Sequence, residues 1–199
     1  MTKKAIVEKK VDVAEALKTM TSEIERVTEK TGANLSPQQR ILMTKVLKDI
    51  FIEGRLPAEA MGFDEEFIKQ VYNIAYNRYN LGLYKDADMM FRFLCLLDPS
   101  SAKFRLGLAA TNHRLKNYDA AIMLYFCVTN VNPENPLPLF YCYDCYMNMD
   151  NPFGAYCVLK SAVEICKDRP EHAQLKARCE QMIEGLQEKL EALKTKETK

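Results

Sequence analysis

Hydrophobic residues recur every three or four positions through most of the chain, which is the spacing of helices that bury one face. Alternation of apolar and polar residues, the pattern of a half-buried strand, is nearly absent. Glycine is also scarce, with 7 among the 199 residues. The pattern therefore predicts an all-α protein.

The first clear helix is expected over residues 37–53, because Ser36 is a good cap, Pro37 suits the first turn and Gly54 can end the helix. The preceding residues, 1–33, have a weaker helical pattern and are expected to form a mobile arm or a loosely attached helix. The helix at 37–53 has a strong apolar face, which needs a partner. That face consists of Ile41, Leu42, Val46, Leu47, Ile50 and Phe51.

Two later segments are near copies of each other. Residues 83–99 read LYKDADMMFRFLCLLDP and residues 117–133 read NYDAAIMLYFCVTNVNP, a shift of about 34 residues, which is the period of tetratricopeptide repeats. A third, weaker copy follows, with Ala155 in the repeated small position but Lys167 where a closing proline would stand. The equivalent pairs are Tyr84 and Tyr118, Ala87 and Ala121, Phe91 and Tyr125, and Pro99 and Pro133.

The repeats predict three tandem helical hairpins that stack because one hairpin alone cannot bury its apolar face. A further, charged helix should cap the array with a polar outer face. The expected architecture is a short right-handed superhelix of three tetratricopeptide-like hairpins, with an N-terminal helix and a C-terminal capping helix. The hairpins are expected at 65–81 with 85–97, 102–115 with 119–131, and 137–149 with 153–167, and the cap at 171–193. The expected domains are a flexible arm at 1–33, a helix and connector at 34–62, the capped repeat domain at 63–193 and a disordered tail at 194–199.

Charge and composition argue against several classes of function. The net charge is +1 with both signs mixed, so no basic stripe for nucleic acid is present. The apolar runs are too short for a membrane span, and the first residues lack the apolar core of a secretory signal. The odd number of cysteines, 7, favours free thiols in a reducing compartment. We therefore expect a cytosolic protein that binds no nucleic acid and does not insert into membranes.

Cys142 and Cys145 form an isolated CxxC motif. A zinc site or a thioredoxin-like site would need a second ligand pair or a βαβ context, and the sequence offers neither. The two histidines, His113 and His172, have no nucleophile placed beside them by the sequence, and no glycine-rich phosphate loop is present. We expect no enzyme activity, no metal and no cofactor.

Tyrosines gather on one face of the first predicted hairpin. Tyr72, Tyr76 and Tyr79 follow each other at i, i+4 and i+7, beside a second stripe that can serve the hairpin core. One interpretation is that these tyrosines pack against the helix at 37–53. The other is that they line a peptide-binding surface, because tyrosine offers apolar area together with a hydroxyl.

These motifs resemble one family within the tetratricopeptide proteins. The segments YNIAYNRYNLGLYKDADMMFRFLCLLDP and FRLGLAATNHRLKNYDAAIMLY, with the third hairpin and a last helix that ends in LEALKTKE, are similar to the class II chaperones of bacterial type III secretion. The resemblance covers about residues 65–195. It implies a cytoplasmic chaperone whose concave groove binds an extended segment of a hydrophobic translocator protein, usually of the type Pro-x-Leu-x-x-Pro. Such a chaperone keeps the translocator soluble and competent for secretion.

The resemblance also implies the residues of the groove, because tetratricopeptide grooves are lined by fixed positions in the first helix of each hairpin. Tyr72, Tyr76 and Tyr79, called the tyrosine ridge from here on, fall on three of these positions. In the first repeat they are Lys69, Tyr72, Tyr76, Tyr79 and Asn80; in the second, Lys103, Leu106, Ala110, His113 and Arg114; in the third, Leu137, Phe140, Asp144, Met147 and Asn148.

Members of this family commonly self-associate through N-terminal helices. Together with the apolar face of 37–53, this predicts a homodimer centred on Leu47, Ile50 and Phe51. The sequence departs from the family in its long N-terminal region and in the missing proline of the third repeat. The alternative interpretation is a generic tetratricopeptide scaffold that binds a short peptide of a cytosolic partner, and a more distant one is an enzyme that uses Cys142 and Cys145.

Overall fold

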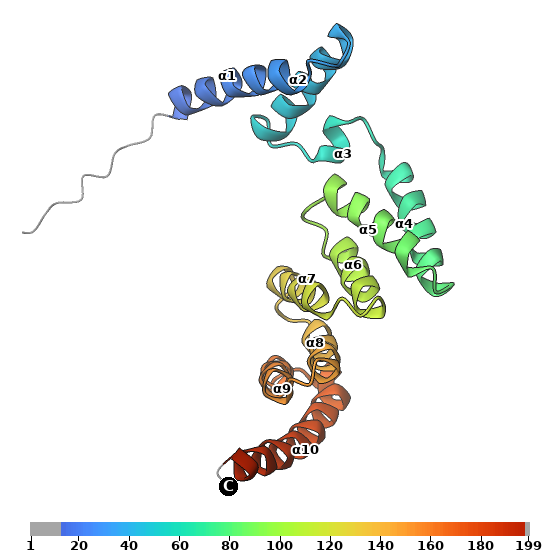
Figure 1. Ribbon diagram of the computed structural model, residues 1–199, viewed down its shortest axis with the longest axis vertical. Helices are drawn as coiled ribbons and strands as arrows, with labels where there is room; N and C mark the ends of the chain where they lie inside the picture. The colour runs from blue at the N-terminus through green and yellow to red at the C-terminus, as the bar shows by residue number, and fades with distance from the viewer. Residues whose placement is uncertain (1–12, 198–199) are drawn as a thin grey trace, which may run out of the picture. The chain divides into compact units, whose positions relative to one another are not determined.

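The protein is helical throughout the part of the chain that the computed structural model describes, residues 13–197, of which Val13 and residues 192–197 are described by their backbone alone. No strand occurs in this range, so the predicted all-α class is confirmed (Figure 1). Within the same range, no helix combines the length and the apolar character that a membrane span requires. The helices are α1 (Val13–Thr31), α2 (Pro37–Phe51), α3 (Pro57–Ala60), α4 (Glu65–Asn80), α5 (Tyr84–Leu97), α6 (Ala102–Arg114), α7 (Tyr118–Val131), α8 (Leu137–Asn148), α9 (Pro152–Cys166), a 3-10 turn (Pro170–His172) and α10 (Ala173–Glu197).

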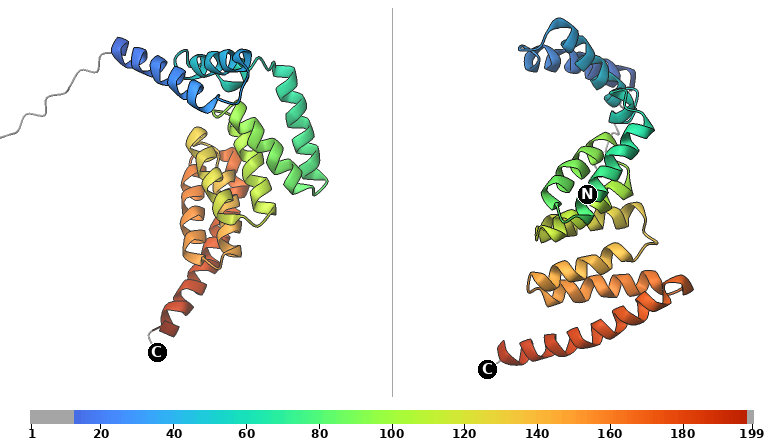
Figure 2. Two further views of the ribbon diagram at one scale, coloured as in Figure 1. Left: turned by 45° about the horizontal axis from the view of Figure 1, so that its top comes forward. Right: turned by 90° about the vertical axis from the view of Figure 1, so that its right-hand side faces the viewer.

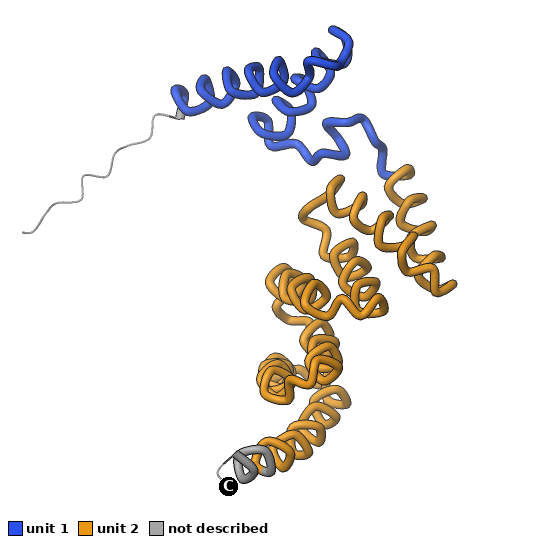
Figure 3. The backbone as a smooth tube through the Cα atoms, in the orientation of Figure 1, with its two compact units in different colours: residues 1–65 blue, residues 66–199 orange. Residues whose placement is uncertain are grey.

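The chain divides into two compact units, Met1–Glu65 and Glu66–Lys199 (Figure 3). The first unit contains α1, α2 and α3, and the second contains the helices of the predicted repeats and α10. The boundary between the two units coincides with the start of the first predicted repeat helix, α4.

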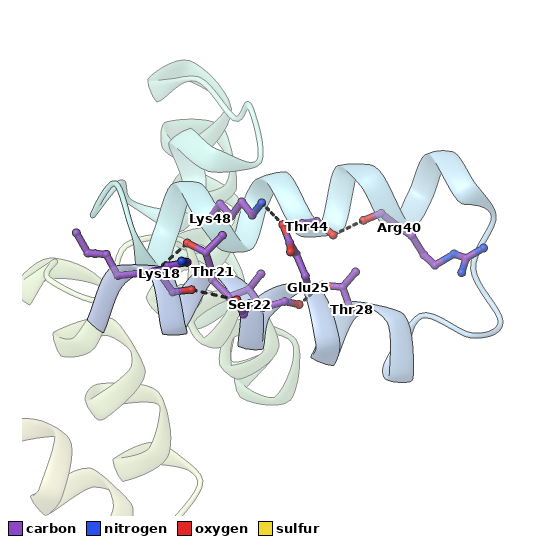
Figure 4. Close-up of polar contacts among 10 residues, drawn as sticks. Lys18, Thr21, Ser22, Glu25, Thr28, Arg40, Thr44 and Lys48 are labelled. Atoms are coloured by element: carbon purple, nitrogen blue, oxygen red, sulfur yellow. Dashed lines mark hydrogen bonds and ion pairs between the residues drawn. The ribbon is translucent and has the colours of Figure 1, made fainter. Parts of the chain in front are cut away.

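In the first unit, α1 and α2 form a hairpin with a largely polar contact. Lys48 Nζ on α2 lies 2.7 Å from Glu25 Oε1 on α1, and Thr28 is buried between the helices (Figure 4). The predicted start of α2 is confirmed: Ser36 caps it, and Ser36 and Gln39 form a reciprocal capping box. Although α2 carries the apolar face found in the sequence, none of its residues is buried.

In the second unit, each helix from α5 to α10 packs against the next (Figure 2). The small residues predicted at the helix crossings, Ala87 and Ala121, are fully buried, as is Ala155 of the third repeat. Phe91 and Tyr125, the large residues predicted to fill the space between hairpins, are also buried. The repeat register read from the sequence is confirmed by this burial.

The turn inside each hairpin repeats as well. Gly82, Lys116 and Asp150 occupy equivalent positions, and all three have positive φ, at 76°, 64° and 54°. Only glycine adopts this conformation without steric strain, so the second and third turns are less favourable than the first. The three turns thus share one backbone geometry even though their residues differ.

The ends of the chain differ in detail from the predicted boundaries. The segment expected to be an arm or a loose helix contains α1, and its residues 1–12 lie outside the described part of the chain. The last helix was predicted at 171–193 but follows a short 3-10 turn and reaches Glu197. Its final turns contain no glycine or proline and are rich in Leu, Lys and Glu, which favour helix continuation.

Candidate functional site

A groove with a volume of about 450 Å³ opens in the second unit. Its walls come from α4, α6 and α8, the first helices of the three hairpins, and its floor comes from α5 and α7. This arrangement follows from the repeat, because equivalent helices lie side by side when hairpins stack. The lining residues are Tyr72, Tyr76, Tyr79, Phe91, Lys103, Leu106, Gly107, Ala110, His113, Arg114, Tyr125, Tyr141 and Asp144.

The α4 wall is the tyrosine ridge. The Tyr72 and Tyr76 rings are stacked with centroids 6.2 Å apart, and Tyr72 also meets the edge of Phe91 at 6.1 Å. Tyr79 contacts the Tyr84 ring at 5.5 Å. Burial raises the pKa of both Tyr72 and Tyr79. Tyr76 is half exposed, so the ridge combines fixed aromatic rings with accessible surface.

The α6 wall combines small, apolar and cationic residues. Gly107 lies directly against the Phe91 ring, where a Cβ atom would be only 2.6 Å from Cζ of that ring. Lys103 lies near the start of α6, with its Nζ atom 3.7 Å from the centroid of the Tyr72 ring. Arg114 ends α6 and donates a hydrogen bond from Nε to the Tyr84 hydroxyl at 2.9 Å. The α6 wall is therefore apolar in its middle and carries one cationic side chain near each end.

The α8 wall is tied to α6 by a polar contact. His113 Nε2 lies 3.0 Å from Asp144 Oδ2, and His113 Nδ1 lies 3.5 Å from the Tyr125 hydroxyl. The Tyr125 ring continues to Tyr141, with centroids 5.4 Å apart. Burial raises the pKa of Tyr125, so its hydroxyl stays protonated at neutral pH. These contacts fix the separation of the second and third repeats at the groove.

The structure brings together most of the residues predicted for the groove, at the positions given above. The six that do not line it are Lys69, Asn80, Leu137, Phe140, Met147 and Asn148, the last of which ends α8. Lys69 pairs with Glu66 at 3.4 Å, and Asn80 and Leu137 are the terminal residues of their helices. Phe140 and Met147 pack against the core formed with α9 and α10, and Arg178 of α10 covers the Phe140 ring at 5.0 Å.

Four lining residues were not predicted: Phe91, Gly107, Tyr125 and Tyr141. The sequence predicts Phe91 and Tyr125 only as residues that fill the space between hairpins. In the structure the same buried side chains also form the floor of the groove. Tyr141 follows Phe140 directly and lies one repeat period after Gly107, which also lines the groove, whereas Phe140 packs in the core with α9 and α10. The signal in the sequence that could have identified Tyr141 is a tyrosine next to a predicted groove residue, Phe140.

The CxxC motif lies in the core beneath the groove. Cys142 and Cys145 are fully buried, and burial raises the pKa of each thiol to about 12. The thiols are therefore protonated at neutral pH, which makes them poor nucleophiles and poor metal ligands. Over the described residues, no group of three or more His, Cys, Asp or Glu side chains is arranged to hold a metal ion.

The residues predicted for a dimer interface lie on α2 in the first unit. Leu47 and Ile50 are partly buried, and the Phe51 side chain is 59% exposed. Ile41 and Leu42, earlier on the same helix, are more exposed still. This surface is separate from the groove, whose lining residues all belong to the second unit.

Comparison with known proteins places the chain among chaperones of type III secretion, although no family model matches it. The low calcium response locus protein H of Yersinia pseudotuberculosis is 32% identical over 124 residues, which are 62% of this chain and 74% of the relative. The chaperone SycD of Yersinia enterocolitica, solved with a peptide of the translocator YopD, is 30% identical, with a TM-score of 0.58 over 63% of this chain and 96% of SycD.

Two further solved structures bear on partners. PcrH of Pseudomonas aeruginosa was solved in complex with the chaperone-binding region of PopD. It is 29% identical, with a TM-score of 0.59 over 64% of this chain and 96% of PcrH. SycD was also solved as an alternative dimer, at 30% identity and a TM-score of 0.58 over 64% of this chain and 97% of that one. On the strength of the repeats, the groove and these similarities, the chain belongs to the family of class II translocator chaperones of bacterial type III secretion.

Proposed function

We propose that this protein binds hydrophobic translocators of a type III secretion system in the bacterial cytoplasm and keeps them soluble and competent for secretion. An extended segment of the translocator occupies the groove between α4, α6 and α8. The mechanism is masking: apolar segments that would otherwise aggregate are held against the chaperone. This mechanism requires no catalytic group.

The groove with its tyrosine ridge carries the proposal. Tyrosine is a good anchor for a bound segment, because its ring supplies apolar contact area and its hydroxyl a hydrogen bond. The ridge is ordered by contacts within the second unit, including the stacked pair Tyr72 and Tyr76. Relatives of the chain hold translocator segments in solved complexes, which supports the same class of client here.

Substitution of Tyr76 tests the groove. Tyr76→Ala removes an aromatic anchor whose truncation costs about 2 kcal/mol in a typical interface, so binding of a Pro-x-Leu-x-x-Pro peptide should weaken roughly thirtyfold. Fluorescence anisotropy with a labelled peptide measures the dissociation constant. The matched control is Phe153→Ala, which removes a largely exposed aromatic side chain of α9 outside the groove. Equal binding by Tyr76→Ala and wild type would contradict the assignment.

We also propose a homodimer that uses α2, centred on Leu47, Ile50 and Phe51. The support is that an apolar helix without a single buried residue gains stability by covering its face. Light scattering at several concentrations should show a dimer for the wild type and a monomer for Leu47→Glu/Phe51→Glu. A wild type that is monomeric at about 100 μM would contradict the proposal, because even an interaction of about −8 kcal/mol would be populated there.

A further inference from the structure

The groove lining carries two cationic side chains and one carboxylate. Lys103 and Arg114 both line it, and neither forms an ion pair with any described residue. The groove carboxylate, Asp144, already contacts His113 at 3.0 Å. With histidine neutral, the lining therefore has a formal net charge of +1, and neither cation is paired with its one carboxylate.

Arg114 is exposed at the end of α6, where its side chain contacts one tyrosine of the neighbouring hairpin. Its Nε atom donates to the Tyr84 hydroxyl at 2.9 Å, and its guanidinium carbon lies 5.3 Å from the centroid of the same ring. Tyr84 is in turn packed against Tyr79 of the ridge. A guanidinium carries five N–H donors, so the bond to Tyr84 leaves the Nη donors available. The planar guanidinium matches a carboxylate, which accepts two parallel hydrogen bonds.

Lys103 has a different setting at the other end of α6. Its ammonium lies 3.7 Å from the centroid of the Tyr72 ring, a cation–π contact that keeps it over the ridge. Residues 103 and 114 are separated by about 16 Å along the axis of α6, given a rise of about 1.5 Å per residue. An ammonium on a flexible stem attracts an anion without fixing its orientation. Of the two cations, Arg114 is therefore the better receptor for a carboxylate.

We propose that the groove selects clients by a carboxylate as well as by apolar anchors. An Asp or Glu side chain within the extended client segment binds Arg114, while an apolar client residue lies against the tyrosine ridge and the small residues of α6. Lys103 adds a weaker, salt-sensitive attraction. The inference rests on the proposed function, since it concerns the same groove. Charge complementarity favours an acidic segment, and we infer an internal one because relatives were solved in complex with the chaperone-binding region of PopD and with a peptide of YopD.

Peptides that differ only in charge test the inference. The probes are Pro-x-Leu-x-x-Pro peptides with blocked ends, in which each x is Glu, Gln or Lys in turn. At low salt the best Glu peptide should bind wild type up to about fivefold more tightly than its Gln counterpart, the size expected of an ion pair with an exposed arginine. Arg114→Gln should abolish this preference, and Arg114→Glu should reverse it in favour of Lys. Lys85→Gln, which removes an exposed lysine outside the groove, should leave it unchanged.

The possible outcomes separate this inference from the proposed function. If Glu and Gln peptides bind wild type equally while Tyr76→Ala loses both, the groove stands and the carboxylate inference fails. In another outcome, a Gln peptide with a free C-terminal carboxylate gains affinity that depends on Arg114, while an internal Glu adds no affinity. That result would mean that the carboxylate comes from a chain end and that the proposed internal Asp or Glu is wrong. If Tyr76→Ala binds every peptide as wild type does, the groove itself is wrong. Thermal melting of the Arg114 variants establishes that they remain folded.

Discussion

The same substitution, glycine to alanine, should have opposite effects at two helical positions of the second unit. Gly107 in α6 touches the Phe91 ring, and a Cβ atom there would lie 2.6 Å from Cζ and 2.7 Å from Cδ1. Carbon atoms in good contact are about 3.5–4.0 Å apart, so either the buried ring or α6 must move. Gly185 in α10 has no such neighbour, since a Cβ atom there would meet nothing within 4 Å.

The magnitudes follow from two competing effects. Alanine is favoured over glycine in a helix interior by about 1 kcal/mol. Overpacking a core typically costs about 1–3 kcal/mol, and Phe91 is only 2% exposed, so its ring has little room to move. Because the ring cannot move away easily, the overpacking cost should lie near the upper end, about 2–3 kcal/mol. Gly107→Ala should therefore destabilise the protein by about 1–2 kcal/mol, whereas Gly185→Ala should stabilise it by up to about 1 kcal/mol.

Thermal unfolding followed by circular dichroism measures both effects. At about 2–4 °C per kcal/mol for a chain of this length, the Tm should fall by about 2–8 °C for Gly107→Ala and rise by up to about 4 °C for Gly185→Ala. Gly185→Ala reports the helix propensity alone and is the matched control. A Tm for Gly107→Ala at or above that of the wild type would refute the reasoning, because it would mean that Phe91 does not occupy the space beside α6.

Three further measurements test the repeat core. Ala121→Leu should destabilise the protein by about 1–3 kcal/mol, because Ala121 is fully buried at a helix crossing, and an unchanged Tm would contradict the register. Ellman's reagent at about pH 8 should label the exposed Cys127 quickly and the buried Cys142 and Cys145 only on unfolding, since their thiols stay protonated; equal rates for all three would contradict their burial. Burial raises the pKa of both thiols from 9.0 to about 12, so between these values the unfolded chain loses protons that the folded protein retains. The free energy of unfolding should therefore be unaffected by these thiols below pH 9 and should fall as the pH rises from 9 to about 12, which urea unfolding at each pH would measure.

The sequence alone determined the repeat and much of the site. A period of about 34 residues identified which positions would be buried, because stacked hairpins place equivalent residues in equivalent surroundings. Ala87, Ala121 and Phe91 are buried as that period required. The spacing of Tyr72, Tyr76 and Tyr79 placed them on one face of α4, and all three line the groove. These features are local or strictly periodic, so the order of residues is sufficient to find them.

Tertiary structure decided the contacts between helices that the period does not describe. Arg114 meets Tyr84 across 30 positions of sequence, and Gly107 meets Phe91 because α5 and α6 cross closely at that level. The third repeat shows this most clearly. The period predicts Phe140 in the groove, but its side chain packs in the core with α9 and α10 and lies under Arg178, while Tyr141 lines the groove. Periodicity specifies which residues share a helix face, whereas the neighbour that covers the face depends on how the helices cross and on the cap at the end of the array.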